Sequence, residues 1–403
     1  MSSSKHHIRN PHGAVRMTAE PQVPAKGGHR SQAHGGIHPL NSFIHRTQQF
    51  EALPLPLGLP PYHLDLAPLY NDPAFGDLKS LTEKSGKLIF HVTGDTGGVK
   101  NGIPQTKVAD AMAEDLQGQE LDRPQFFYHL GDVVYFNGEH DQYYEQFYEP
   151  YGKYSAPIVS IPGNHDGDPV DQNTPSLDGW VRFFMTKEPS IDGESGDEPR
   201  LTMTQPNPYW TLITPFATIV GLYTNVPEHG SIDSVQQQWL TNEFATADKD
   251  KAFIVALHHP IYSFDDHHSG SSRMADVIQQ AINDSRRVPN LVLTAHVHNY
   301  QRIEREIIAG TKTPFLVVGN GGYHNLHHLP KDSSQVQDDQ TGAKLIYGDD
   351  KRYGYLTLTV DGEAIRGTQT AIDLKSDEPQ KNQDTFVYSG KALFLAEGQI
   401  VNL

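Results

Sequence analysis

The chain of 403 residues contains no cysteine and no apolar run long enough to cross a membrane as a helix. The lack of cysteine excludes disulfide bonds, thiolate catalysis and cysteine-bound zinc or iron–sulfur clusters. Residues 1–30 also lack the apolar core of a signal peptide. We therefore expect a soluble, cytoplasmic protein; secretion is the alternative, because trimming at the start site would remove an export signal.

Basic residues are outnumbered by acidic ones. The chain has 32 Lys and Arg against 49 Asp and Glu, which gives a formal net charge of −17 at pH 7. Proteins that bind long nucleic acids need clusters of Lys and Arg to displace counterions from the phosphate backbone. The charge balance therefore argues against a long nucleic acid as partner. It is compatible with bound metal ions, whose charge dominates a local site.

Composition divides the chain into four parts. Residues 1–50 are rich in His, Gly, Ser and basic residues and predict a flexible arm, whose histidines could also bind metal weakly. Residues 51–86 include a proline-rich stretch that cannot be a central strand or a helix interior, so we expect it to lie extended on the core. Residues 87–373 have the patterns of a catalytic domain, and residues 374–403 predict a C-terminal strand and tail.

Apolar spacing within the catalytic part predicts both helices and strands. Helices are expected over 106–117 and 272–285 and after Asn137, and a β-hairpin is expected over 209–222. Polar and apolar residues alternate over 355–360, as in a half-buried antiparallel strand. The order of elements predicts an α/β fold, a four-layer α+β sandwich in which two mixed β-sheets pack face to face with helices outside.

Five short motifs each follow an apolar, strand-like run. Polar side chains just past the end of a buried strand are where α/β folds place their chemistry. The five motifs are Gly94–Gly97, Gly131–Tyr135, Gly163–Asp166, Val255–His258 and His296–His298.

These motifs carry seven oxygen and imidazole donors and no sulfur donor, a set that suits Fe, Mn or Zn. Seven donors exceed what one ion needs if water and substrate also bind. Two ions that share one bridging carboxylate use the set fully, and such pairs hydrolyse phosphate esters. The predicted donors are Asp95, Asp132, Tyr135, Asn164, His258, His296 and His298.

In this order the motifs resemble those of the calcineurin-like metallophosphoesterases and, among them, the purple acid phosphatases, whose signature is GDxG, GDxxY, GNH(D/E), VxxH and GHxH. Every block matches except that Ala295 occupies the first position of the last block. The resemblance implies a dimetal site at the carboxyl ends of the strands. The implied ligands are Asp95, Tyr135 and His298 for the first ion, Asn164, His258 and His296 for the second, and Asp132 as the bridge.

Two positions indicate the purple acid phosphatase group. Most calcineurin-like enzymes begin with Asp-x-His, in which the His is a ligand, but Gly97 occupies that position here. By the resemblance, Tyr135 supplies the missing donor, and a tyrosinate ligand favours Fe(III). The implied cofactors are therefore Fe(III) and one divalent ion of Fe, Zn or Mn, with a purple colour.

Three histidines are implied as catalytic residues. His267 and His268 follow His258 by nine and ten residues, the offset of a histidine pair in plant purple acid phosphatases. With His165, they are implied to contact phosphate oxygens and to assist the departure of the leaving alkoxide. The pair could instead be exposed loop residues. The same choice between pocket and surface loop stays open for His324, His327 and His328.

Together these features predict a dinuclear-metal phosphoesterase that hydrolyses small phosphomonoesters by attack of a metal-bound hydroxide. One alternative is a phosphodiesterase for cyclic or small nucleotides, because the same dimetal core cleaves diesters elsewhere in the superfamily. Another is a non-catalytic metal-binding module that uses the His-rich arm. The sequence predicts neither the oligomeric state nor the physiological substrate.

Overall fold

The computed structural model describes residues 49–66, 78–330, 336–376 and 378–403. The predicted arm over residues 1–50 lies outside the described residues except for its last two positions. Within the described part of the chain, no helix is both long and apolar enough to cross a membrane.

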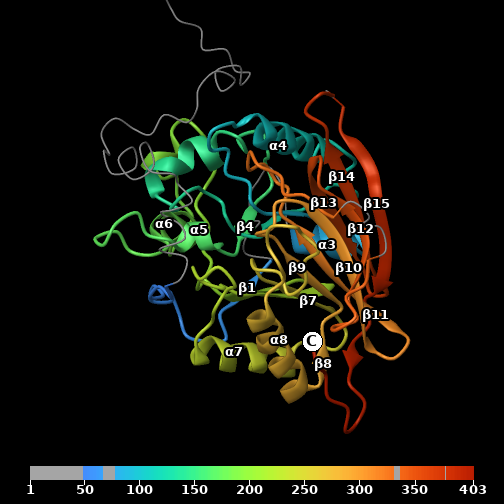
Figure 1. Ribbon diagram of the computed structural model, residues 1–403. Coiled ribbons are helices and arrows are strands. Elements are labelled where there is room, and N and C mark those ends of the chain that lie inside the picture. Colours follow the sequence, from blue (N-terminus) through green and yellow to red (C-terminus); the bar gives the residue numbers. More distant parts are fainter. Residues whose placement is uncertain (1–48, 67–77, 331–335, 377) are drawn as a thin grey trace, which may run out of the picture.

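Two mixed β-sheets pack face to face with helices outside them, which confirms the predicted fold class (Figure 1). The eight-stranded sheet has the order β1 (His63–Asp65), β5 (Trp210–Ile213), β6 (Ala217–Gly221), β7 (Ala252–Ala256), β9 (Leu291–Thr294), β11 (Thr311–Val318), β10 (Tyr300–Ile308) and β12 (Lys344–Asp349). The six-stranded sheet has the order β15 (Gln380–Ser389), β14 (Ala364–Ile372), β13 (Tyr353–Val360), β2 (Leu88–Thr93), β3 (Phe127–His129) and β4 (Ile158–Ser160). A third sheet pairs β8 (Arg287–Val288) with β16 (Leu393–Phe394).

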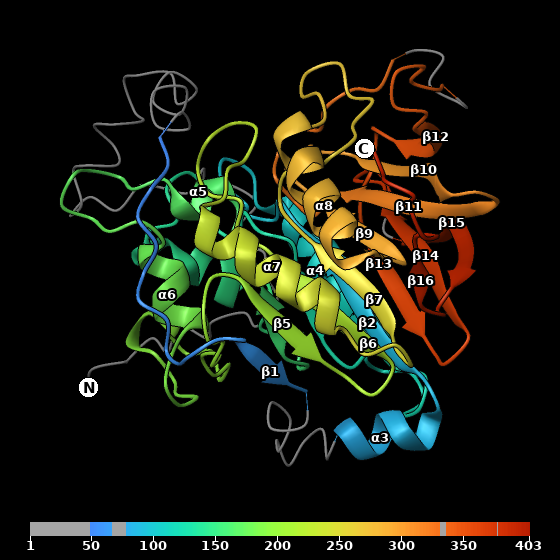
Figure 2. The ribbon, with the colours of Figure 1, turned by 90° about the horizontal axis from the view of Figure 1, so that it is seen from below.

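Helices cover the outer faces of these sheets. Helix α4 packs on β13 and β14, and α7 and α8 pack side by side along the eight-stranded sheet (Figure 2). The α-helices are α3 (Leu78–Ser85), α4 (Ile103–Asp115), α5 (Asn164–Gly167), α6 (Asp178–Phe184), α7 (Ser234–Thr246) and α8 (Ser272–Ser285). Short 3-10 turns cover His140–Gln142 and Gly193–Ser195, and a short π-helix covers Tyr144–Tyr148.

Alternation along the strands produces two separate cores. In β13, Leu356 faces the core between the sheets, whereas Tyr355 belongs to the outer core that includes α4. In β7, Ile254 faces the inner core, whereas Phe253 contacts Phe244 of α7 with ring centroids 4.8 Å apart. Successive side chains of a strand point to opposite faces, so central strands such as β2, β7 and β9 are buried on both sides.

Most of the predicted elements are present. Helix α8 has the predicted bounds, the hairpin forms as β5 and β6, and α4 begins at Ile103 because Pro104 is favourable in a first helical turn. The helix expected after Asn137 is present as a 3-10 turn followed by the short π-helix. This widened turn brings Gln146 to the backbone of Tyr135, where it makes two hydrogen bonds of 2.9 and 2.7 Å.

The segments at both ends of the catalytic part contact its sheets. Strand β1 pairs in parallel with β5, and the indole of Trp239 donates a 2.7 Å hydrogen bond to the Pro61 carbonyl. Beyond residue 373, strand β15 pairs with β14 at the edge of the six-stranded sheet.

Parallel pairing collects the predicted donors at one side of the molecule. Strands β2, β3 and β4 are parallel neighbours in one sheet, and β7 and β9 are parallel neighbours in the other. The carboxyl ends of parallel neighbours lie at the same edge, which places the loops after all five strands together.

Candidate metal centre

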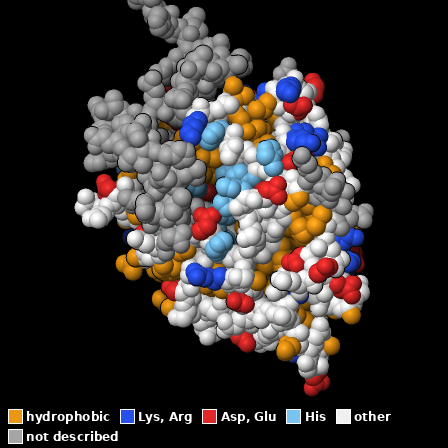
Figure 3. Space-filling view, in the orientation of Figure 1, with side chains coloured by type: hydrophobic (Ala, Val, Ile, Leu, Met, Phe, Trp, Pro, Cys, Tyr) orange, Lys and Arg blue, Asp and Glu red, His pale blue; other side chains and the backbone are white. Residues whose placement is uncertain are grey.

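The seven predicted donors converge where the two sheets meet, and each sheet contributes one kind of donor. The space-filling view shows histidine side chains gathered in the middle of this face (Figure 3). The oxygen donors follow strands of the six-stranded sheet: Asp95 after β2, Asp132 and Tyr135 after β3, and Asn164 after β4. The imidazole donors follow strands of the eight-stranded sheet: His258 after β7, and His296 and His298 after β9.

Three of these donors have an unusual backbone conformation. Asp95, Asp132 and His296 have φ angles of 54°, 55° and 67°, in the left-handed region that residues with a Cβ rarely adopt. Such residues persist only where the surrounding structure holds them, and they cluster at functional sites. The strained turns after β2, β3 and β9 therefore mark this point of the fold as specialised.

The donors implied for the first ion lie within hydrogen-bonding range of one another. The Tyr135 hydroxyl donates a 3.1 Å hydrogen bond to Asp95 Oδ1 and lies 3.3 Å from His298 Nε2. His298 Nε2 is 3.6 Å from Asp95 Oδ1. The tyrosine predicted to replace a missing ligand thus stands beside the two donors with which it was grouped.

The remaining donors form a second cluster. Asn164 Oδ1 lies 3.1 Å from His258 Nε2 and 3.0 Å from His296 Nδ1. Asp132 Oδ2 is 3.4 Å from His258 Nε2. Ligand atoms of Asp95, Asp132 and His258 all lie within 4.8 Å of one another, a spacing that could hold a metal ion. Asp132 therefore stands next to both clusters.

Two glycines make room for these side chains. A Cβ at position 97 would lie 2.6 Å from Gln146 Oε1 and 2.7 Å from Tyr135 Cδ2, so glycine at this position leaves space for the tyrosine ring. A Cβ at position 94 would lie 2.6 Å from the Cβ of Ala295. The methyl group of Ala295, which departs from the family pattern, thus fits only because residue 94 is glycine.

Hydrogen bonds to backbone carbonyls orient several imidazoles. The Nδ1 of His258 donates to the Leu130 carbonyl at 2.8 Å, and that of His298 donates to the Asn325 carbonyl at 3.0 Å. A ring nitrogen that donates in this way orients the imidazole and turns the other nitrogen toward the site. In both residues that nitrogen is Nε2, which faces the cluster.

A carboxylate that the sequence did not single out holds two of the loops together. Asp166 accepts hydrogen bonds from the backbone N–H groups of Gly163 at 2.8 Å and of Val133 at 3.0 Å. These bonds join the loop after β4 to the loop after β3. Asp166 thereby fixes the relative positions of Asn164 and Asp132.

The charge distribution fits a cation. Burial alone would raise the pKa of Asp132, but the imidazoles of His258 and His165 hold it well below the ordinary value. Burial alone would lower the pKa of His258, but the Asp132 carboxylate raises it to about 9. Burial lowers the pKa of His296 to about 4, which keeps this imidazole in the neutral form that binds metals. Among the described residues, none donates a hydrogen bond to the buried Asp132 Oδ2. The donor set therefore fits hard or borderline metal ions.

The histidines implied as catalytic lie beside this cluster. The backbone N–H of His165 donates to Asp132 Oδ1 at 2.9 Å, and its Nε2 is 3.9 Å from Asp132 Oδ2. The ring of His268 is 5.0 Å from that of His296, and the ring of His267 is 4.6 Å from that of His268. The histidine pair is thus at the site, with His267 at its exposed edge.

The structure adds three residues that sequence patterns did not assign to the site. Glu228 Oε1 is 2.9 Å from His268 Nδ1, and the ring of Tyr323 packs 4.1 Å from that of Tyr135. His327, one of three histidines left open, packs with its ring 4.4 Å from that of His298. These residues lie in loops without periodicity, so the sequence pattern alone could not place them at the site.

Comparisons with known proteins agree with this geometry. The family model described as calcineurin-like phosphoesterase matches residues 88–300. A search of curated protein sequences finds no match.

Solved structures show the same fold. GAP50, described as the anchor in the inner membrane complex of Plasmodium, is similar with a TM-score of 0.53 and 15% identity, over 76% of this chain and 89% of that chain. The purple acid phosphatase PPD1 from yellow lupin (Lupinus luteus) seeds is similar with a TM-score of 0.53 and 17% identity, over 75% of this chain and 54% of that chain. At these identities the likeness shows the fold. Since the family model spans more than half of the chain and all its motifs meet at one site, this protein belongs to the calcineurin-like phosphoesterase family.

Proposed function

We propose that this protein is a dinuclear metal-dependent phosphoesterase that hydrolyses small phosphomonoesters, as purple acid phosphatases do. The observation that carries the proposal is the position of Tyr135, whose hydroxyl lies 3.1 Å from Asp95 and 3.3 Å from His298. A phenol oxygen buried among metal-type donors is the feature that distinguishes this group within the family resemblance. It supports Fe(III) as one of the two ions.

The two clusters would hold one ion each. Asp95, Tyr135 and His298 would bind the first ion; Asn164, His258 and His296 would bind the second; and Asp132 would bridge both. When bound, such a pair supplies a hydroxide nucleophile at neutral pH and neutralises charge on phosphoryl oxygens.

The three catalytic histidines would bind the phosphate group and deliver a proton. The Nδ1 of His165 donates to the Phe136 carbonyl at 2.9 Å, so its Nε2 is directed away from the backbone. His267 and His268 face the site from the loop between β7 and α8. An imidazolium here would stabilise charge on the phosphoryl oxygens and protonate the leaving alkoxide. We expect a small phosphorylated substrate, because the net charge of −17 repels long nucleic acids.

Paired substrates test this function. A sample loaded with metal ions should hydrolyse an aryl phosphomonoester faster than the matching bis-aryl phosphodiester, because the monoester leaves one more charged oxygen for the ions and histidines to bind. Initial rates for both compounds on the same sample give the ratio. A preference for the diester would replace the proposal with the phosphodiesterase alternative. Full metal content without turnover of either compound would favour a binding role.

Tyr135→Phe tests the iron assignment. The substitution removes only the phenol oxygen, so the iron-loaded variant should lose its visible absorption while its melting temperature changes little. Absorption spectra at equal iron content provide the measurement. Tyr323→Phe is the matched control, because its ring lies 4.1 Å from that of Tyr135, and it should keep the colour. Persistence of the band in Tyr135→Phe would show that this tyrosine is not the chromophore ligand.

A further inference from the structure

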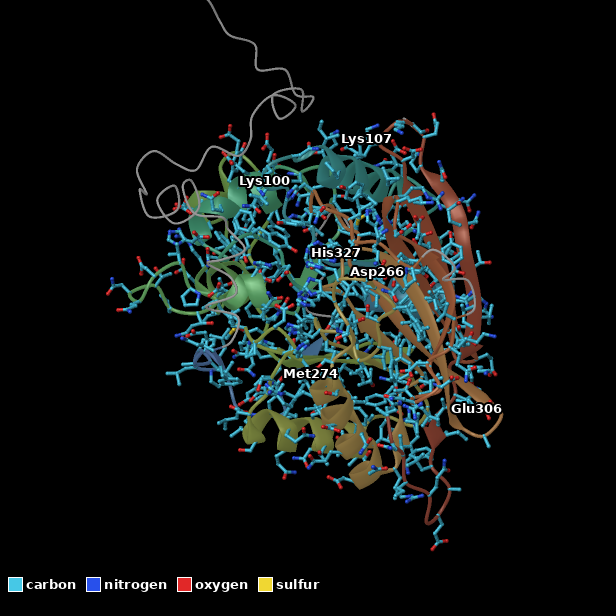
Figure 4. All side chains as sticks on the ribbon, in the orientation of Figure 1. Lys100, Lys107, Asp266, Met274, Glu306 and His327 are labelled. Carbon is cyan, nitrogen blue, oxygen red and sulfur yellow. The ribbon has the colours of Figure 1, made fainter. Side chains whose placement is uncertain are left out.

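Three imidazoles outside the seven donors form a cluster of their own at the rim of the metal centre. His267 and His268 lie in the loop between β7 and α8, and His327 lies in the loop after β11. One ring nitrogen from each lies within 4.8 Å of the other two. The ring centroid of His327 lies 5.1 Å from that of His267 and 5.0 Å from that of His268. Figure 4 shows His327 near the centre of this face, beside Asp266 of the opposite loop.

Hydrogen bonds fix the two loops before any ligand binds. Asp265 Oδ1 accepts the backbone N–H groups of His267 at 2.8 Å and of His268 at 2.7 Å. The His327 N–H donates to the His298 carbonyl at 3.0 Å, and the Asp266 N–H donates to the carbonyl of the next residue, His328, at 3.0 Å. The three imidazoles are therefore presented by a preorganised frame, which lowers the entropic cost of binding.

Carboxylates stand behind two of the imidazoles. Glu228 Oε1 is 2.9 Å from His268 Nδ1, which leaves His268 Nε2 without this partner. Asp265 Oδ1 is 3.9 Å from His327 Nδ1. The His327 side chain is only 7% exposed, and its Nδ1 makes no hydrogen bond with the described residues. A buried nitrogen without a partner is available to a ligand. Carboxylate–histidine pairs such as Glu228–His268 orient the imidazole ligands of zinc.

We propose that His267, His268 and His327 form a third cation site, selective for Zn²⁺, at the entrance to the dimetal centre. Three imidazoles with one open position are a known zinc environment, in which water completes the tetrahedron. The site uses none of the seven donors assigned to the two other ions. It shares His267 and His268 with the phosphate-binding role proposed above.

This overlap makes the third ion an inhibitor. Imidazoles that bind Zn²⁺ cannot contact phosphoryl oxygens at the same time, so excess zinc should compete with substrate. The inhibition rests on the proposed phosphatase function, whereas the binding of a third ion does not. Counting bound zinc therefore tests the site even if the protein hydrolyses neither test substrate.

His327→Ala separates the third site from the other two. Full-length protein already loaded with two ions is titrated with Zn²⁺ by calorimetry, so histidines elsewhere add the same background to every variant. The wild type should bind one further equivalent, and His327→Ala should weaken this step by more than about 100-fold, since even residues that only orient a ligand affect affinity 10- to 100-fold. The zinc concentration that halves aryl phosphate hydrolysis, measured against each variant's own rate in zinc-free buffer, should rise equally.

Two further variants complete the test. His328→Ala should behave as the wild type, because that neighbouring side chain is 78% exposed and lies outside the cluster. His267→Ala should weaken the third step as strongly as His327→Ala does, and the fold should tolerate this change because the side chain of His267 is exposed. The proposal is overturned if either cluster variant binds the third ion as tightly as the wild type, or if the wild type binds only two.

Discussion

Replacing Asp132 by asparagine should remove both metal ions and lower kcat/KM for a phosphomonoester by about 1,000-fold or more. The reason is that Asp132 stands between the two clusters and its Oδ2 lacks a hydrogen-bond donor among the described residues. Metal ions contribute several kcal/mol to hydrolysis at phosphorus, and each 1.36 kcal/mol corresponds to a tenfold change in rate. Elemental analysis after gel filtration measures the loss. Two ions at full occupancy in the variant would contradict the bridging role.

A half-buried carboxylate outside the metal centre provides the control. Asp115 lies in α4 and accepts hydrogen bonds from Lys381 and Tyr355, both at 2.7 Å. Asp115→Asn should keep both metal ions but lower the free energy of unfolding by about 1–3 kcal/mol, as the loss of hydrogen bonds to a charged group does. Metal-free Asp132→Asn should also be less stable than the metal-free wild type, because the imidazoles of His258 and His165, which lower the pKa of Asp132, lose their charged partner.

Replacing Gly163 by alanine should damage both the fold and the metal centre. A Cβ at this position would lie 2.1 Å from Asp132 Oδ1 and 2.5 Å from the Asp132 backbone nitrogen. Neither the loop after β3 nor the loop after β4 can move without losing the hydrogen bonds that Asp166 accepts from Val133 and Gly163. We expect the free energy of unfolding to fall by about 1–3 kcal/mol, as at other overpacked sites, and the metal content to fall as well.

Urea unfolding with and without added metal ions checks this prediction. Gly362→Ala is the control, because a Cβ there would meet no atom within 4 Å, and surface changes of this kind stay within about 0.5 kcal/mol. Equal unfolding midpoints for the two glycine variants would show that Asp132 is free to shift away, which would remove the steric explanation for glycine at this position.

Much of the site could be predicted because it lies at strand ends. A buried strand is visible in the sequence as an apolar run, and parallel neighbours bring the residues after each run to one edge. The positions of Asp95 and Asp132 follow from this rule alone. Their left-handed backbone does not follow from it, since only contacts in the folded chain hold a residue with a Cβ in that conformation.

Residues in irregular loops could not be placed from the sequence. Nothing in the local pattern distinguishes His327 from His328, yet the first is buried at the rim and the second points outward. Long-range hydrogen bonds hold this loop in place, from the His327 N–H to the His298 carbonyl and from the Asp266 N–H to the His328 carbonyl. Glu228 was missed for a related reason, because its role depends on the distant His268. Such residues need tertiary contacts to be recognised.

The division of donors between the sheets has a consequence for how the molecule holds together. Oxygen ligands arise from the six-stranded sheet and nitrogen ligands from the eight-stranded sheet, so neither sheet can coordinate an ion with its full set alone. Bound ions would therefore cross-link the two sheets of the sandwich. Ions that bind only the assembled state add RT ln(1 + [L]/Kd), which is about 2.7 kcal/mol at a concentration 100 times Kd. The free energy that holds the two sheets together would then depend on the concentration of free metal ions around the protein.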